Sequence, residues 1–441
     1  MRRLALTFAA LLTASSAWAD AWVGGSLSGS GRTEALAMCY AHTSTKATCI
    51  ARRATSVTNV GTVYTVSSAG IAASAVSPTA PSLSNTGKVM LVGGNATTLL
   101  IGGGGGTGRW LDSSPLSSIS WTRQKDEASS GYGFAGIATP SSPDKTYQHA
   151  QFGGTDATLF NISISPWAFG NLASNTPTPG DQEVVSASVS ATYYCIVAGE
   201  YSSGQPTMRG YTSGTSFAYT TTASAIMSAS SYFYPPFGLG STACVSTHKK
   251  ANNSHTYIMS APIGGTITTT DAGAIDLMPL GDWDPTGTLR RGWWVNKADG
   301  TVRVSNSATT VGSISTNATY DIGSTPLAGS TPLFAIMGLD VDRDGTATDN
   351  PVVMMADGSH FAAWGACVDA DGDGYPGADS IFCSTHTEDC NDGSASIHPG
   401  ATETPNDGID QDCSGVDLVI RPVARASSLG SRLRPTIRGT L

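Results

Sequence analysis

The residues with the clearest capacity for chemistry form a short acidic run near the C-terminus. Aspartates alternate there with small residues, as Asp369, Asp371 and Asp373, and are followed by Gly374 and Tyr375. Aspartates at alternating positions of a tight loop turn their carboxylates toward one point, and the glycine permits the sharp bend. The backbone carbonyl of Tyr375 can add another oxygen. Because calcium takes about six to eight oxygen ligands in relaxed geometry, this run predicts a calcium-binding loop.

The run is not an EF-hand. An EF-hand requires a glutamate at the position that Ser380 occupies, and the flanking sequence does not favour helices. The remaining oxygen ligands must therefore come from other residues. The nearest suppliers are Asp379, Asp389 and Asp392.

Acidic residues continue through the whole stretch from Cys367 to Asp417, which holds ten Asp and two Glu but no Lys or Arg. Near its end lie three more candidate ligands, Asp407, Asp410 and Asp412. Such a stretch repels itself unless cations neutralise it, and its apolar content is too low to build a core. We expect metal and disulfides to order it, as in other small cross-linked modules. The alternative is a solvated acidic linker.

A second loop has the same alternating spacing, with Asp340, Asp342 and Asp344 followed by Asp349. It lies between two strand candidates, 334–337 and 352–355. This position predicts a calcium loop inside a hairpin, and the alternative is a solvated Asp-rich turn.

The N-terminus predicts export. Arg2 and Arg3 precede an apolar run and then small residues that end at Ala19, so residues 1–19 are predicted to be a signal peptide that is cut before Asp20. No later apolar run is long enough to form a transmembrane helix.

Export makes disulfides chemically permissible, and the eight cysteines are an even number. We predict that Cys39 pairs with Cys49, that Cys195 pairs with Cys244, and that two bridges form inside the C-terminal segment. Structural zinc is the rival interpretation, but no C-x-x-C pair occurs and the seven histidines are scattered.

Residues 20–366 have the composition of an all-β domain. Charged residues make up only 13% of the chain, and short apolar runs alternate with Gly, Pro, Ser, Asn and Asp. The pairs of runs at 293–304 and 354–361 each enclose an Asp-Gly step, which predicts hairpins. About seven such units follow one another from Ala35, and this period predicts a β-propeller of about seven blades. A β-sandwich and a β-helix are the alternatives.

The acidic segment resembles the metal-binding module of the MopE family, which is named after a copper-binding bacterial surface protein. The resemblance is carried by Cys367 to Tyr375, Asp389 to Asp392, Ile397 to Ala401, and Glu403 to Cys413. The Asp-rich loops are also similar to thrombospondin type 3 calcium repeats. The resemblance implies metal binding at the outer surface without an enzyme activity. The preceding domain is only loosely similar to FG-GAP and RCC1-like propellers.

These features divide the chain into a signal peptide (1–19), an all-β domain (20–366), a metal-binding module (367–417) and a basic tail (418–441). They predict an exported, non-catalytic calcium-binding protein, secreted or on the bacterial surface. Its β domain would bind a cell-surface protein or polysaccharide. The net charge of −9 disfavours nucleic acid as a partner.

Two other functions remain open. One is an extracellular propeller hydrolase or lyase in which calcium is only structural. The other is a copper-binding surface protein, for which His386 and His398 would be the imidazole ligands. Carboxylate and carbonyl oxygens favour calcium, whereas copper prefers imidazole or sulfur.

Overall fold

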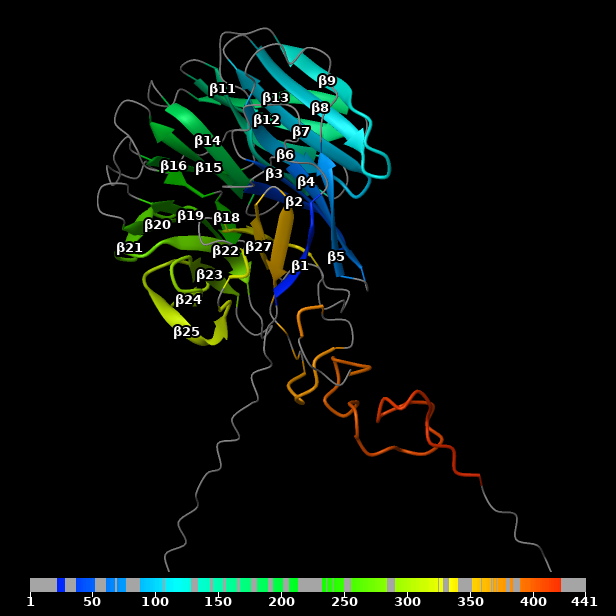
Figure 1. Ribbon diagram of the computed structural model, residues 1–441. Helices are drawn as coiled ribbons and strands as arrows, with labels where there is room; N and C mark the ends of the chain where they lie inside the picture. Colours follow the sequence, from blue (N-terminus) through cyan, green and yellow to red (C-terminus); the bar gives the residue numbers. More distant parts are fainter. Residues whose placement is uncertain are drawn as a thin grey trace, which may run out of the picture.

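The regular secondary structure in the described part of the chain consists of β-strands, as the composition predicts (Figure 1). The predicted signal peptide and residues 422–441 of the basic tail lie outside the described residues. In this computed structural model the described residues are 22–421, apart from gaps at 28–36, 52–60, 68–69, 77–87, 106–107, 128–133, 143–145, 154–155, 165–166, 176–180, 189–192, 201–205, 213–231, 235, 241, 250–254, 284–289, 324, 328–332, 340–350, 358, 366, 368, 370, 378–380 and 384–388.

The first three units along the chain are four-stranded and antiparallel. The first contains β2 (Ala37–Thr43), β3 (Lys46–Ala51), β4 (Gly61–Ser67) and β5 (Gly70–Val76). The second contains β6 (Lys88–Gly94), β7 (Thr98–Gly105), β8 (Gly108–Pro115) and β9 (Thr122–Glu127). The third contains β10 (Phe134–Ser142), β11 (Thr146–Gly153), β12 (Asp156–Ile164) and β13 (Trp167–Asn175). A short parallel pairing of β6 with β10 joins the second and third units into one sheet.

The next three units are also antiparallel, although the number of strands described in them differs. The fourth contains β14 (Asp181–Ser188), β15 (Tyr193–Glu200) and β16 (Pro206–Thr212). In the fifth, β17 (Tyr232–Phe233) and β18 (Phe237–Leu239) pair with β19 (Ala243–Lys249), which is followed by β20 (Thr256–Pro262) and β21 (Thr268–Asp271). The sixth contains β22 (Leu277–Trp283), β23 (Arg291–Asn296), β24 (Thr301–Ser305) and β25 (Ile314–Asp321).

The last unit is completed by the N-terminal strand. β26 (Leu333–Ile336), β27 (Val352–Ala356) and β28 (His360–Trp364) form an antiparallel sheet, and β1 (Trp22–Ser26) adds to its edge in register from Trp22 opposite Trp364 to Ser26 opposite His360. The two ends of the strand-forming region are therefore held in one sheet.

The units form a closed ring. The leading strands contact one another in sequence, β2 to β6, β10, β14, β18, β22 and β26, and β26 contacts β2 again. Figure 1 shows these sheets arranged around a common centre. Within the described residues the chain is thus a seven-unit β-propeller, in agreement with the sequence-based prediction. The hairpins predicted at 293–304 and 354–361 are β23–β24 and β27–β28.

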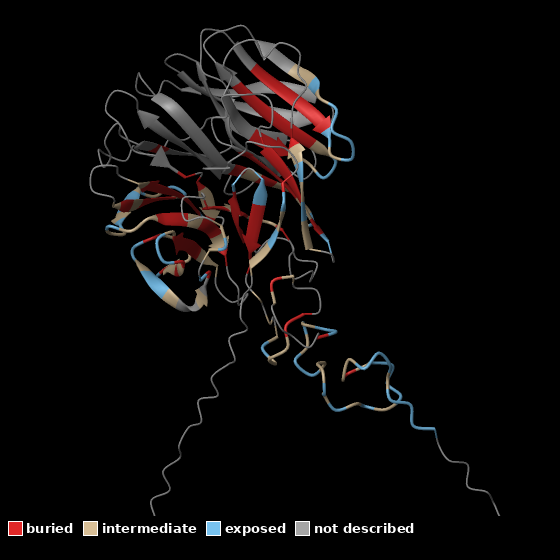
Figure 2. Cartoon of the chain, in the orientation of Figure 1, coloured by how far each residue is buried: buried red, intermediate tan, exposed pale blue. Residues whose placement is uncertain are grey.

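The core lies between adjacent units, because successive side chains of a strand point to opposite faces. In β27, Met354 packs toward the first unit, whereas Val353 and Met355 pack toward the sixth. Trp293 and Trp294 likewise enter two different clusters. Buried residues accordingly follow the sheets, and the C-terminal segment is mostly intermediate or exposed (Figure 2).

No helix in the described residues is long and apolar enough to cross a membrane.

Candidate metal centre

The chain leaves the propeller after Trp364 and forms a loop that the disulfide Cys367–Cys383 closes. Phe382, at the end of this loop, is fully buried in the core between the last and first units, and Ile381 packs against the same cluster. Gly365 makes room for the ring, because a Cβ there would lie 2.4 Å from a Phe382 ring carbon. The loop that carries the predicted calcium ligands is therefore fixed to the propeller.

Within this loop, backbone N–H groups hold the carboxylates in place. Asp369 accepts hydrogen bonds from the amides of Gly372 at 2.8 Å and Gly374 at 2.7 Å, and Asp373 accepts one from Tyr375 at 2.8 Å. Gly372 and Gly374 have φ angles of 80° and 96°, a region that glycine enters without strain. The alternation of Asp with Gly thus builds the tight bend that the sequence predicts.

The carboxylates of two segments converge. Ligand oxygens of Asp369, Asp371 and Asp373 lie within 4.8 Å of one another, and so do those of Asp371, Asp389 and Asp392. Because Asp371 belongs to both groups, the five residues form one cluster, which we call the first acidic cluster. Their arrangement could hold a cation with oxygen ligands.

Three oxygens in this cluster are buried without any hydrogen-bond partner, namely Asp371 Oδ2, Asp373 Oδ2 and Asp389 Oδ2. Asp389 is only 2% exposed, and its other oxygen accepts the amide of Asn391 at 2.8 Å. A buried polar atom without a partner costs free energy. A bound cation would offset that cost at the unpartnered oxygens that it contacts.

Burial and mutual repulsion raise the pKa values of these acids. Desolvation is the main cause that raises the pKa of Asp371, and the charges of Asp373 and Asp369 raise it further. Desolvation likewise raises the pKa of Asp373 and of Asp389, and neighbouring carboxylates add to the effect. Ionisation of these three carboxyl groups is therefore disfavoured unless a positive charge lies nearby.

One imidazole lies beside the cluster. The His398 ring stacks on Tyr375, with centroids 5.0 Å apart and planes 8° from parallel. Its Nδ1 lies 3.2 Å from the carbonyl oxygen of Pro399. The described cysteines of the module offer no free thiol as a ligand, because Cys367, Cys383, Cys390 and Cys413 all form disulfides.

A second acidic cluster lies further along the module and contains Glu403, Asp410 and Asp412. Here the carboxylates have backbone partners. Glu403 accepts the amides of Gln411, Asp412 and Leu418, and both oxygens of Asp410 accept amides, from Ser414 and Gly415. The hydroxyl and amide of Ser414 lower the pKa of Asp412. Backbone amides therefore already compensate part of the charge of this cluster.

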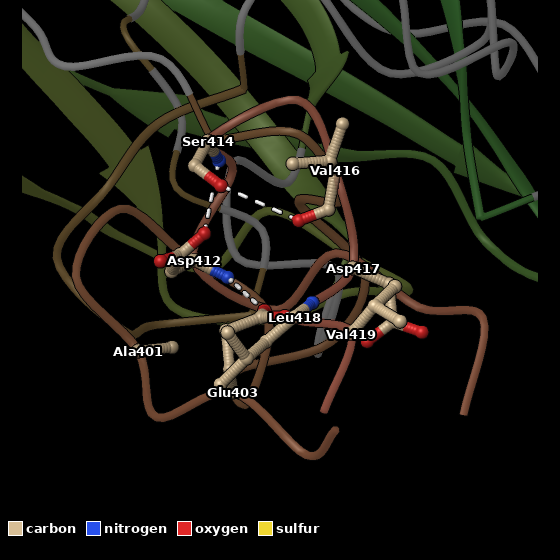
Figure 3. Close-up of a pocket in the computed structure, with 8 residues that line it drawn as sticks. All are labelled: Ala401, Glu403, Asp412, Ser414, Val416, Asp417, Leu418 and Val419. Atoms are coloured by element: carbon tan, nitrogen blue, oxygen red, sulfur yellow. Dashed lines mark hydrogen bonds between the residues drawn. The ribbon is translucent and has the colours of Figure 1, made fainter. Parts of the chain in front are cut away.

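An open groove of about 610 Å³ borders the second cluster (Figure 3). Glu403, Asp412 and Asp417 lie on it together with the apolar side chains of Val416, Leu418 and Val419. Val416 is 71% exposed and Val419 is 62% exposed. The groove combines acidic groups with apolar ones.

The structure brings together many, though not all, of the predicted ligands. Asp369, Asp371, Asp373, Asp389 and Asp392 meet in the first cluster, and Asp410 and Asp412 meet in the second. Asp407 belongs to neither, and it accepts the side-chain amide of Gln411 at 2.7 Å. Glu403 was not among the predicted ligands. Asp340, Asp342, Asp344, Asp349 and Asp379 lie outside the described residues.

The disulfide predictions hold where the structure describes them. Cys39 and Cys49 face each other on β2 and β3 and are bonded. The module contains two internal bridges, Cys367–Cys383 and Cys390–Cys413. Cys244 is also disulfide-bonded.

Comparison with known proteins supports the assignment of the later part of the module. The family model Cu-binding_MopE, described as "Putative metal-binding motif", matches residues 389–417. No sequence among the curated proteins matches the chain.

Several solved structures resemble the chain. They include an oligogalacturonate lyase in complex with manganese (10% identity, TM-score 0.44, covering 79% of this chain and 97% of the other). The WD40 domain of SCAP from fission yeast has 8% identity and a TM-score of 0.36, with coverage of 78% and 98%. The Dos1 propeller has 9% identity and a TM-score of 0.39, with coverage of 74% and 93%. All three TM-scores are low, so the propeller assignment rests on the closed ring of units in this chain. The protein combines that β-propeller with a MopE-like metal-binding module.

Proposed function

We propose that this is an exported, non-catalytic protein that binds calcium at the first acidic cluster and uses its propeller as an interaction face. The observation that supports calcium binding is the presence of three unpartnered buried oxygens, on Asp371, Asp373 and Asp389, in two overlapping carboxylate groups that share Asp371. Such a group stabilises the folded protein only when a cation compensates its charge.

The donor atoms favour calcium over copper. The cluster offers carboxylate oxygens from five aspartates, and the carbonyl of Tyr375 stays a predicted sixth ligand. Hard oxygen donors in flexible loops suit calcium, whereas copper prefers nitrogen and sulfur. His398 is the one histidine among the described residues of the module, and the described sulfurs are in disulfides. Copper binding therefore stays the alternative outcome of the test.

Export is supported by the disulfides and by the predicted signal peptide at residues 1–19. Disulfides persist in oxidising compartments outside the cytoplasm, and three described bridges are spread over the propeller and the module. We place the protein at the cell surface or in the medium. Its proposed partner is a surface protein or a polysaccharide.

Calorimetric titration of the oxidised, chelator-treated full chain tests the metal assignment. Calcium, magnesium and copper(II) would be titrated into the wild type, an Asp371→Asn, Asp373→Asn double variant, and a matched Asp410→Asn, Asp412→Asn control. We expect calcium binding in the wild type and the control and its loss in the first variant. Copper binding without calcium binding would overturn the assignment and direct attention to His398.

A further inference from the structure

The C-terminal module consists of two halves, each closed by its own disulfide. The anchored half is residues 367–383, closed by Cys367–Cys383, and the distal half is residues 389–421, which contains Cys390–Cys413. Neither disulfide joins one half to the other. The connection between them must therefore come from the chain itself and from non-covalent contacts.

The two halves differ in how they are attached to the propeller. Phe382 of the anchored half is fully buried against strands of the last and first units. Among the described residues, the core clusters contain no member after Phe382. The large apolar side chains of the distal half, such as Val416, Leu418 and Val419, are exposed instead. The distal half thus has no apolar anchor of its own in the part of the chain described.

The contacts between the halves gather at the first acidic cluster. Asp389 forms an isolated bridge with Gly377, and its amide donates to the carbonyl of Pro376 at 3.3 Å. Tyr375 of the anchored half stacks on His398 of the distal half. Ligand oxygens of Asp371 in the anchored half lie within 4.8 Å of those of Asp389 and Asp392 in the distal half.

The charges at this junction oppose its closure when no cation is present. Three anionic carboxylates within 4.8 Å repel one another, and the repulsion is strong where the groups are shielded from water. A divalent cation turns the net repulsion between the halves into attraction, because it attracts carboxylates from both halves at once. The long Asp389–Pro376 backbone hydrogen bond, the Tyr375–His398 stack and the hydrogen bond from the Ser394 backbone to Asp371 are weak by comparison.

We propose that the cation at the first acidic cluster is the joint that fixes the distal half to the propeller, so that cation binding sets the position of the acidic and apolar groove. This inference rests on the proposed calcium site. Without the cation, the anchored half stays on the propeller through Phe382, while the distal half keeps its disulfide but separates from the anchored half. With the cation, the groove is held at a fixed place beside the ring of units.

Hydrogen–deuterium exchange of the oxidised full chain tests the joint, with calcium or with chelator. The informative amides lie at the junction: that of Asp389, which donates to Pro376 of the anchored half, and those of Asn391 and Ser394, beside the Asp389 and Asp371 carboxylates. We expect their exchange to slow by about tenfold or more when calcium is added. Amides of β19 in the propeller should not change.

Two variants separate the joint from simple folding. Asp389→Asn keeps the oxygen that accepts the Asn391 amide but removes the buried charge, and should abolish the calcium effect on the distal half. Asp417→Asn is the matched control, since Asp417 lies in the distal half, accepts the amides of Asn406 and Gly408, and lies outside the first cluster. The control should respond to calcium as the wild type does.

Calorimetry on the same samples distinguishes the two claims. If calcium produces no binding heat, the proposed function fails. If calcium binds but slows exchange only within residues 369–377, the site stands and the joint is overturned. If calcium binds and protects residues 389–394 in the wild type and the Asp417→Asn control only, the joint is supported.

Discussion

In the first acidic cluster, one oxygen each of Asp371, Asp373 and Asp389 is buried without a partner, whereas in the second cluster Glu403 and Asp410 accept backbone amides on both oxygens. The pKa of the first three acids is raised by desolvation and by neighbouring carboxylates. The pKa of Asp412, in the second cluster, is lowered by its bonds to Ser414.

The comparison shows that acidic content alone does not define a cation site. Both clusters contain carboxylates at similar separations, but only the first leaves buried oxygens unsatisfied. Backbone amides already stabilise the second cluster's charges. The first cluster is also the one that lies next to the propeller anchor at Phe382. Variants that alter one cluster or its support and leave the other intact test this difference.

Removing the anchor should have the largest effect. Phe382→Ala deletes a fully buried ring, and we expect a loss of about 3–5 kcal/mol in the free energy of unfolding. Urea denaturation followed by tryptophan fluorescence measures it. Gly365→Ala should also disturb this contact, because the added Cβ would collide with the Phe382 ring. Wild-type stability in both variants would show that the anchored half is not held by Phe382.

Neutralising the first cluster should weaken calcium binding strongly. Asp371→Asn with Asp373→Asn removes two of five charges, and we expect calcium affinity to fall by roughly 100-fold, since ligand charge governs affinity in such loops. Calorimetry measures the change. An equal loss in the Asp410→Asn, Asp412→Asn control would mean that the two clusters do not differ as described.

The distal disulfide should support the first cluster indirectly. Cys390 follows Asp389, and the bridge to Cys413 restrains that segment. Replacing both cysteines by serine should lower calcium affinity by about tenfold, because the loop must then be ordered on binding. The same titration, with circular dichroism to confirm that the propeller is intact, checks the expectation. Unchanged affinity would show that Asp389 needs no covalent support.

Acid should affect the two clusters in opposite directions. The raised pKa values of Asp371, Asp373 and Asp389 mean that, in chelator, the folded module binds protons more tightly than the unfolded chain. Its stability should therefore rise as pH falls toward the usual aspartate value of 3.8. The lowered pKa of Asp412 gives a contribution that is present above 3.8 and is lost as pH falls further. Calcium affinity should weaken in acid, because protons compete for the first cluster, and titrations at several pH values measure this.

The smallest effect on calcium should come from Glu403→Gln. Glu403 accepts three amides within the distal half, so its replacement should cost about 1–2 kcal/mol of local stability. Calcium affinity should change by less than about twofold. Exchange rates of the Gln411 and Leu418 amides report the stability, and calorimetry reports the affinity. A large loss of affinity would place Glu403 in the calcium site.

The local patterns in the sequence predict much of this architecture. Short apolar runs and Asp-Gly turns mark the hairpins, and the spacing of Asp369, Asp371 and Asp373 marks the loop in which they converge. Pairing of Cys39 with Cys49 also follows from their proximity in the chain. Each of these features depends on residues that are close in sequence, where turn geometry limits the possibilities.

Features that depend on distant residues could not be predicted in this way. β1 pairs with β28 more than 300 residues away, and nothing in the short run from Trp22 to Ser26 indicates its partner. Phe382 is a lone aromatic in an acidic segment, and only the fold shows that it enters the propeller core. Glu403 lies near Asp410 and Asp412 because its carboxylate accepts hydrogen bonds from the amides of Gln411 and Leu418.

Anomalous diffraction from crystals of the oxidised full chain soaked in a calcium-mimicking lanthanide would locate the bound cation. We expect a peak at about 2.3–2.6 Å from carboxylate oxygens of Asp369, Asp371, Asp373 and Asp389, with none at Glu403, Asp410 and Asp412. A peak at the second cluster with an empty first cluster would contradict it.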